Sequence, residues 1–91
     1  MNLKKIKIIK ADKRGVVYEC GPGMYVERKK GTVTADHVHD DISETLYLVK
    51  GTIELTIGRE VQKVAAPIKI EIPKKIYHKI IALSDIEFIK I

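Results

Sequence analysis

Short segments of alternating apolar and polar residues follow one another along the chain. In residues 68–72 three isoleucines alternate with a lysine and a glutamate, and residues 53–57 show the same period of two. Such a period places successive side chains on opposite faces of a β-strand. No stretch combines helical periodicity with helix caps. The pattern predicts an all-β protein.

Turn-forming residues, chiefly glycine, proline and aspartate, separate these segments at short intervals. The strands expected between them are 3–9, 16–20, 24–29, 32–39, 44–50, 52–57, 68–72, 76–83 and 86–91. Around Gln62 we expect a turn and nothing longer. Many short strands with frequent turns are typical of a β-sandwich or barrel. No repeat or long linker divides the chain, so we expect a single domain over residues 1–91.

Composition supports the strand prediction and indicates the cellular compartment. Isoleucine, valine and threonine together supply 28 of the 91 residues, and β-branched side chains favour strands. No apolar run reaches the roughly 18–20 residues of a membrane span. The basic start of the chain has lysines throughout and does not resemble a secretory signal. With a single cysteine, Cys20, we expect a cytoplasmic protein.

The formal net charge of +5 raises the question of nucleic-acid binding. Lysines outnumber arginines 14 to 3, whereas arginine is the better reader of bases and phosphates. The lysines alternate with isoleucines and form no basic cluster interleaved with aromatic residues. We therefore do not expect a nucleic-acid partner. The many lysines and few amides are instead typical of proteins from thermophiles.

The three histidines and one glutamate carry the candidate chemistry. His37 and His39 are two residues apart, so on a regular strand both imidazoles project from one face, shared with Val33 and Ala35. We expect this face to be the inner one. If residues 40–43 form a tight hairpin, Glu44 returns beside the histidine strand, because cross-strand neighbours lie about 5 Å apart.

His78 shares its strand face with Ile76, Ile80 and Ala82. A neutral imidazole among aliphatic side chains needs a partner, and a metal ion supplies one. The alternatives are that His78 is a core histidine satisfied by another partner, and that the other two histidines are surface residues.

The spacing Gly31-x5-His37-x-His39-x4-Glu44-x6-Gly51 resembles the first signature motif of the cupin superfamily at every named position. The second cupin motif, Gly-x5-Pro-x-Gly-x2-His-x3-Asn, is matched in part. Here the chain reads Pro67-x5-Pro73-x-Lys75-x2-His78-x3-Ala82. Pro73 and His78 agree with the motif, whereas Pro67, Lys75 and Ala82 depart from it. At Lys75 a glycine would tolerate positive φ, so we expect that turn to be strained or reshaped.

The resemblance implies a double-stranded β-helix, the cupin form of the jelly roll. It also implies that His37, His39, Glu44 and His78 hold one divalent transition metal ion. Three imidazoles and one carboxylate suit Fe, Mn, Ni, Co, Cu or Zn better than Ca or Mg. A divalent ion with one ionised glutamate leaves a positive site that favours a small anionic ligand.

Several functions fit this resemblance. One is a small metal-dependent enzyme of dioxygenase, isomerase or lyase type, in which the metal does most of the work because no general base or nucleophile stands out. Another is a non-catalytic cupin that binds or senses a small ligand through its metal. A third prediction, a homodimer, rests on an outer sheet face that we expect to carry Tyr47, Val49, Tyr77 and Ile81.

Overall fold

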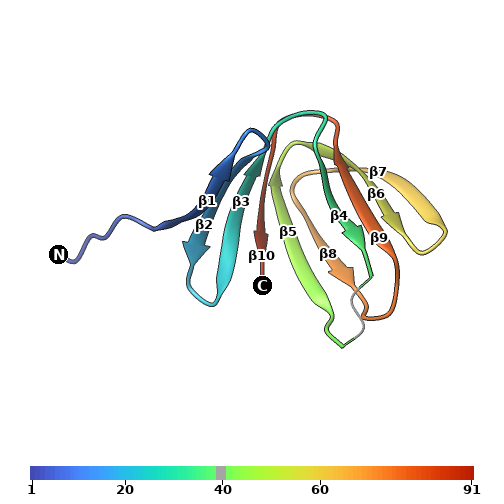
Figure 1. Cartoon of the computed structure of the whole chain (residues 1–91), viewed down its shortest axis with the longest axis horizontal. Helices are drawn as coiled ribbons and strands as arrows, with labels where there is room; N and C mark the ends of the chain where they lie inside the picture. Colours follow the sequence, from blue (N-terminus) through green and yellow to red (C-terminus); the bar gives the residue numbers. More distant parts are fainter. Residues whose placement is uncertain (39–40) are drawn as a thin grey trace.

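The structure, a computed structural model, describes residues 1–38 and 41–91. Within these ranges the chain forms β-strands that pair antiparallel in two sheets (Figure 1). The six-stranded sheet contains, in spatial order, β1 (Ile8–Asp12), β2 (Gly15–Cys20), β3 (Gly23–Arg28), β10 (Ile86–Lys90), β5 (Glu44–Lys50) and β8 (Ile68–Ile72). The four-stranded sheet contains β4 (Val33–His37), β9 (His78–Ala82), β6 (Thr52–Ile57) and β7 (Glu60–Ala65).

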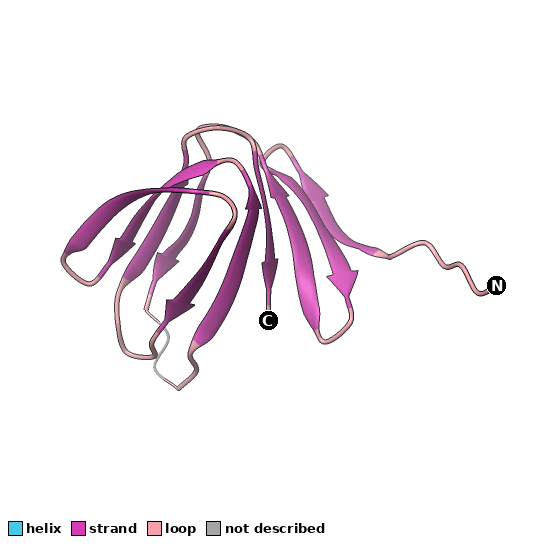
Figure 2. Ribbon diagram, turned by 180° about the vertical axis from the view of Figure 1, so that it is seen from behind, coloured by secondary structure: helices cyan, strands magenta, loops and turns pink. Residues whose placement is uncertain are grey.

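The order of the strands has the crossing pattern of a jelly roll. From β3 onward the chain passes between the sheets, with β3, β5, β8 and β10 in one and β4, β6, β7 and β9 in the other. Figure 2 shows strands and loops throughout the described part of the chain. In that part, no helix is long and apolar enough to span a bilayer. The all-β jelly-roll prediction is therefore confirmed.

The core lies between the two sheets and is built from the inward positions of the alternating strands. Among the described residues, the buried apolar side chains are Val17, Val26, Leu46, Leu48, Ile53, Leu55, Val64, Ile70, Ile72, Ile80, Ala82, Ile86 and Phe88. Burial of each valine, leucine, isoleucine or phenylalanine side chain stabilises the fold by about 1.5–3 kcal/mol. Two polar residues, Glu44 and His78, are buried with them.

The first strand does not lie where the sequence pattern placed it. We expected a strand over residues 3–9, whereas β1 begins at Ile8 and continues to Asp12. A two-residue turn pairs Asp12 with Gly15, and this fixes the register of β1 against β2. The carbonyl oxygen of Lys7 still accepts a hydrogen bond from the backbone N–H of Glu19. Because β2 ends at Cys20, the first residues of the chain run past the end of their partner strand. They extend away from the body of the molecule (Figure 1).

The expectation of only a turn around Gln62 is wrong. Residues Glu60–Ala65 form strand β7, which pairs along its whole length with β6. The strand escaped the pattern because it lies at an edge of its sheet and only Val64 of its six side chains is buried. An edge strand with one buried side chain shows little alternation of apolar and polar residues, so the sequence pattern does not predict it.

The outer face proposed for a dimer does not exist as one surface. Tyr47 and Val49 lie on β5 of the six-stranded sheet. Ile81 lies on β9 of the four-stranded sheet, and Tyr77 directly precedes that strand. Alternation along each strand places all four side chains outward, but on opposite sides of the sandwich. The sequence could not show this, because sheet membership is decided by pairing between distant strands.

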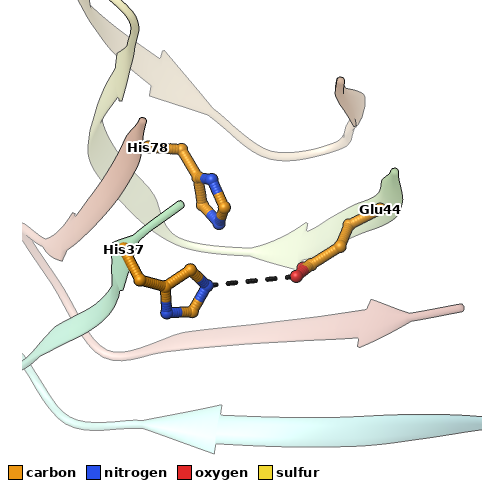
Figure 3. A group of neighbouring side chains, drawn as sticks. All are labelled: His37, Glu44 and His78. Carbon is orange, nitrogen blue, oxygen red and sulfur yellow. Dashed lines mark ion pairs between the residues drawn. The ribbon is translucent and has the colours of Figure 1, made fainter. Parts of the chain in front are cut away.

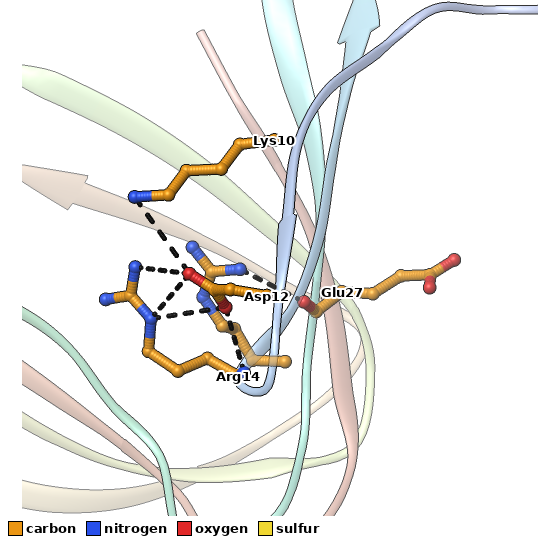
Figure 4. Close-up of polar contacts among 5 residues, drawn as sticks. Lys10, Asp12, Arg14 and Glu27 are labelled. Carbon is orange, nitrogen blue, oxygen red and sulfur yellow. Dashed lines mark hydrogen bonds and ion pairs between the residues drawn. The ribbon is translucent and has the colours of Figure 1, made fainter.

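The turn between β1 and β2 carries a compact charge cluster (Figure 4). The backbone N–H of Arg14 donates to Oδ1 of Asp12 at 2.9 Å, and its guanidinium Nη2 lies 2.9 Å from Oδ2. The ammonium of Lys10 lies 4.0 Å from the same oxygen. Hydrogen bonds from Arg14 lower the pKa of the Asp12 carboxyl from 3.8 to about 2.

Candidate metal centre

A β-bulge aims His37 at the interior. Thr34 on β4 pairs with Ile80 on β9, but the next aligned pair is His37 with His78, so β4 has one residue more than its partner. Ala35 lies in the bulge with a positive φ of 55°. The extra residue reverses the alternation, and Thr34 and His37 come to share a face. Our expectation that Val33 and His37 share the inner face is therefore wrong, and Val33 is exposed.

His78 is the most deeply buried polar residue of the described chain, with 0% of its surface exposed. Its position on the same face as Ile80 and Ala82 is confirmed by their burial. The ring nitrogen Nδ1 lies 3.3 Å from the carbonyl oxygen of Ile76. A carbonyl oxygen only accepts, so this contact favours the tautomer with the proton on Nδ1, which leaves Nε2 available to a metal ion. Metal-binding histidines commonly have this arrangement.

Glu44 opens β5 and points inward with Leu46 and Leu48, as alternation predicted. Its route to the histidines differs from the one expected. Strand β5 pairs with β10 and β8, whereas β4 pairs with β9 in the other sheet, so β4 and β5 form no hairpin ladder. The carboxylate reaches His37 across the space between the sheets instead, because the chain crosses from one sheet to the other between residues 37 and 44.

His37, Glu44 and His78 converge at one end of the sandwich (Figure 3). One ligand atom from each lies within 4.8 Å of the others, so the group could hold a metal ion. Oε1 of Glu44 lies 4.0 Å from Nε2 of His37, and the two imidazole rings meet edge to face with centroids 4.5 Å apart. The side chain of Glu44 is 4% exposed and that of His37 is 42% exposed. The site therefore has a buried floor and opens to solvent beside His37.

The fourth predicted ligand, His39, lies outside the described residues, and its role stays a prediction. The departures from the second motif can be placed. Lys75 keeps the left-handed conformation that the motif glycine would have, with φ of 65°. The turn thus holds its shape at a cost of about 1–2 kcal/mol in backbone strain. His78 occupies its position on the inner face without the motif glycine.

Lys90 lies near the site and was not predicted from the sequence, whereas Tyr77 was expected on an outer face. The ammonium of Lys90, at the end of β10, lies 3.5 Å from Oε2 of Glu44. On the outer side of β4 and β9, the hydroxyl of Tyr77 donates a hydrogen bond to Asp36. This bond raises the pKa of Tyr77 above its ordinary value. The bond ties together the residues that directly precede His78 and His37. A weak sequence signal existed for Lys90, which continues the inward alternation of Ile86 and Phe88.

The fold of this chain is similar to several solved structures. The capsular polysaccharide assembling protein CapF of Staphylococcus aureus matches with a TM-score of 0.79 and 17% identity, over 97% of this chain and 28% of that one. KdgF of a Halomonas species matches with a TM-score of 0.76 and 16% identity, over 92% and 83%. Bacillus subtilis oxalate decarboxylase, whose Mn(II) centres have been characterised, matches with a TM-score of 0.76 and 22% identity, over 93% and 26%.

The chain thus spans less than a third of CapF and of oxalate decarboxylase. No curated protein matches it. The family model of the cupin domain matches residues 24–90, which include β3 to β10 and the three converging side chains. By this match over most of its length, the chain belongs to the cupin-domain family.

Proposed function

We propose that this protein binds one divalent transition metal ion through His37, His39, Glu44 and His78. The convergence of three of these side chains from β4, β5 and β9, in two different sheets, carries the proposal. Two imidazoles and a carboxylate are a donor set that suits Fe, Mn, Co, Ni, Cu or Zn. The contact between Nδ1 of His78 and the carbonyl oxygen of Ile76, which favours a free Nε2 for a metal ion, supports the same assignment.

The surroundings fit a metal-dependent enzyme for a small anionic substrate, of dioxygenase, isomerase or lyase type. A bound ion of this kind supplies a Lewis acid or an activator of oxygen. The chain supplies the rest: Glu44 and His78 form a buried floor, and the exposed side chain of His37 marks where a ligand enters. In the register of the sheets, Ile72 lies opposite Glu44 and Ile57 opposite His78, so aliphatic groups exclude water from that floor.

A non-catalytic cupin that binds or senses a small ligand through its metal is the second candidate. One observation favours it. The hydroxyl of Tyr77, which could otherwise serve as a proton donor, faces the outer side and engages Asp36. General acid–base catalysis needs a group within hydrogen-bond reach of the substrate.

The two candidates differ in turnover. The purified, untagged protein should contain about one transition metal ion per chain by elemental analysis, and the Glu44→Gln variant should contain much less. The loaded protein is then assayed for oxygen consumption and for conversion of a panel of small organic acids. Metal-dependent turnover that is lost in Glu44→Gln supports the enzyme. Ligand-induced stabilisation without turnover supports the binder, and absence of metal from the wild-type protein refutes both.

We further propose that residues 1–91 form one cupin domain, which acts as a homodimer in the cytoplasm. The lone Cys20 supports a reducing compartment. The exposed apolar side chains of Tyr47 and Val49 on the outer face of β5 support self-association. A monomer in light scattering at high protein concentration would contradict the dimer.

A further inference from the structure

Lys90 occupies an unusual place for a lysine. It follows Ile86 and Phe88 at intervals of two along β10, and both of these side chains are buried in the core. Its partner in the register of β5 is Leu46, which is also buried. Alternation therefore puts an ammonium group on the inner side of a central strand, where lysine is rare unless it is paired.

The ammonium of Lys90 and the imidazole of His37 approach the same carboxylate from its two oxygens. Nζ of Lys90 lies 3.5 Å from Oε2 of Glu44, whereas Nε2 of His37 lies 4.0 Å from Oε1. The side chain of Lys90 is 32% exposed, so its ammonium meets both the buried carboxylate and solvent. The distance of 3.5 Å exceeds that of a strong hydrogen bond, and an ammonium has three donors. Lys90 can therefore bind a second anionic group while it stays beside Glu44.

The same two strands carry a second lysine–glutamate pair that serves as a reference. Nζ of Lys50 on β5 lies 3.5 Å from Oε2 of Glu87 on β10. The separation equals that of the Lys90–Glu44 pair, but the side chains of Lys50 and Glu87 are 64% and 28% exposed. An exposed pair of this kind is screened by water and contributes little. The structure thus contains a matched pair of ammonium groups, of which only Lys90 adjoins the candidate metal centre.

The charge of the site depends on Lys90. A divalent ion with one ionised glutamate gives a formal charge of about +1, and the ammonium raises it to about +2. We propose that Lys90 is a second anion-recognition group, through which the site selects small dianions, above all short dicarboxylates, over monoanions. The inference rests on the proposed metal binding. One carboxylate of the ligand binds at the metal, and the other forms an ion pair with Lys90.

Isosteric ligands test this selection. Malonate is a dianion at neutral pH, and malonamate has nearly the same shape with one charge fewer. Calorimetric titration of the Mn²⁺-loaded protein should show tighter binding of malonate. Lys90→Met should weaken malonate binding by about tenfold, which corresponds to about 1.4 kcal/mol, and change malonamate binding by less than about twofold. Lys50→Met should behave like the wild-type protein with both ligands.

Titration with Mn²⁺ alone separates this inference from the proposed function. We expect Lys90→Met to bind Mn²⁺ at least as tightly as the wild-type protein, since an adjacent positive charge is removed. If the wild-type protein binds no metal, the proposed function and this inference both fail. Only the inference fails if metal binds but Lys90→Met weakens the binding of malonate and of malonamate equally, or weakens the binding of neither ligand. Circular dichroism checks the fold, and Lys90→Gln replaces Lys90→Met if the methionine variant does not fold.

Discussion

The bulge at Ala35 makes a quantitative prediction, because this residue adopts a backbone conformation that alanine disfavours. Its φ of 55° lies in the left-handed region, and it stands two residues before His37 at the point where β4 changes phase. We predict that Ala35→Gly is neutral or stabilising. Ala35→Val, which puts a β-branched residue at positive φ, should destabilise the fold.

The magnitudes follow from opposing terms. The left-handed conformation costs an L-residue about 1–2 kcal/mol, and glycine avoids that cost. Glycine loses about 0.5–1 kcal/mol more than alanine in chain entropy on folding. Ala35→Gly should therefore change the free energy of unfolding by between about 0 and +1.5 kcal/mol. Ala35→Val should lower it by more than about 1 kcal/mol.

Urea unfolding at constant pH measures both variants, with Ala82→Gly as the control. Ala82 lies on β9, the partner strand of β4, and is buried without positive φ, so glycine there should destabilise by about 1 kcal/mol. The explanation by bulge geometry is refuted if Ala35→Gly destabilises as much as Ala82→Gly, or if Ala35→Val is neutral.

Three further predictions concern the fold. Lys75→Gly should raise or leave unchanged the melting temperature, because φ at Lys75 is 65°; a clear fall would contradict the strain. Ile53→Ala should lower the free energy of unfolding by about 2–5 kcal/mol, since Ile53 is 1% exposed; a loss below about 1 kcal/mol would show that the core collapses around it. Arg14→Leu should raise the pKa of Asp12 from about 2 toward 3.8 in an NMR titration. The native pKa is the lower one, so the contribution of Asp12 to stability is complete above pH 3.8, disappears as the pH falls through 2, and shrinks in Arg14→Leu.

The sequence was sufficient for the parts of the fold that depend on local alternation. Strands β6, β8 and β9 bury one side each, so their period of two is clear, and Glu44 and His78 inherit an inward position from their apolar neighbours. The resemblance to cupins added the topology, which residue patterns alone left open between a sandwich and a barrel. The first step rests on side chains that repeat along one strand, and the second on motif spacings between Gly31 and Ala82.

The features that the sequence did not reveal depend on pairing between strands. The phase of β4 changes at Ala35 because one extra residue faces β9, and nothing in a threonine–alanine–aspartate run marks a bulge. Glu44 approaches His37 from the opposite sheet, and Lys90 approaches Glu44 from a neighbouring strand far away in the sequence. Spacing along one segment cannot give these contacts, because they arise only when distant strands pair within a sheet or when the two sheets pack together.

Metal affinity measured by calorimetric titration of Zn²⁺ into the metal-free protein is the most direct test of the candidate centre. We predict one tight site per chain in the wild-type protein and a loss of at least about tenfold in affinity in both His78→Ala and Glu44→Gln. Glu54→Gln, a change on β6 outside the cluster, should leave the affinity unaltered. Equal affinity in all four proteins, or no binding in the wild-type protein, would show that these side chains meet without forming a metal site.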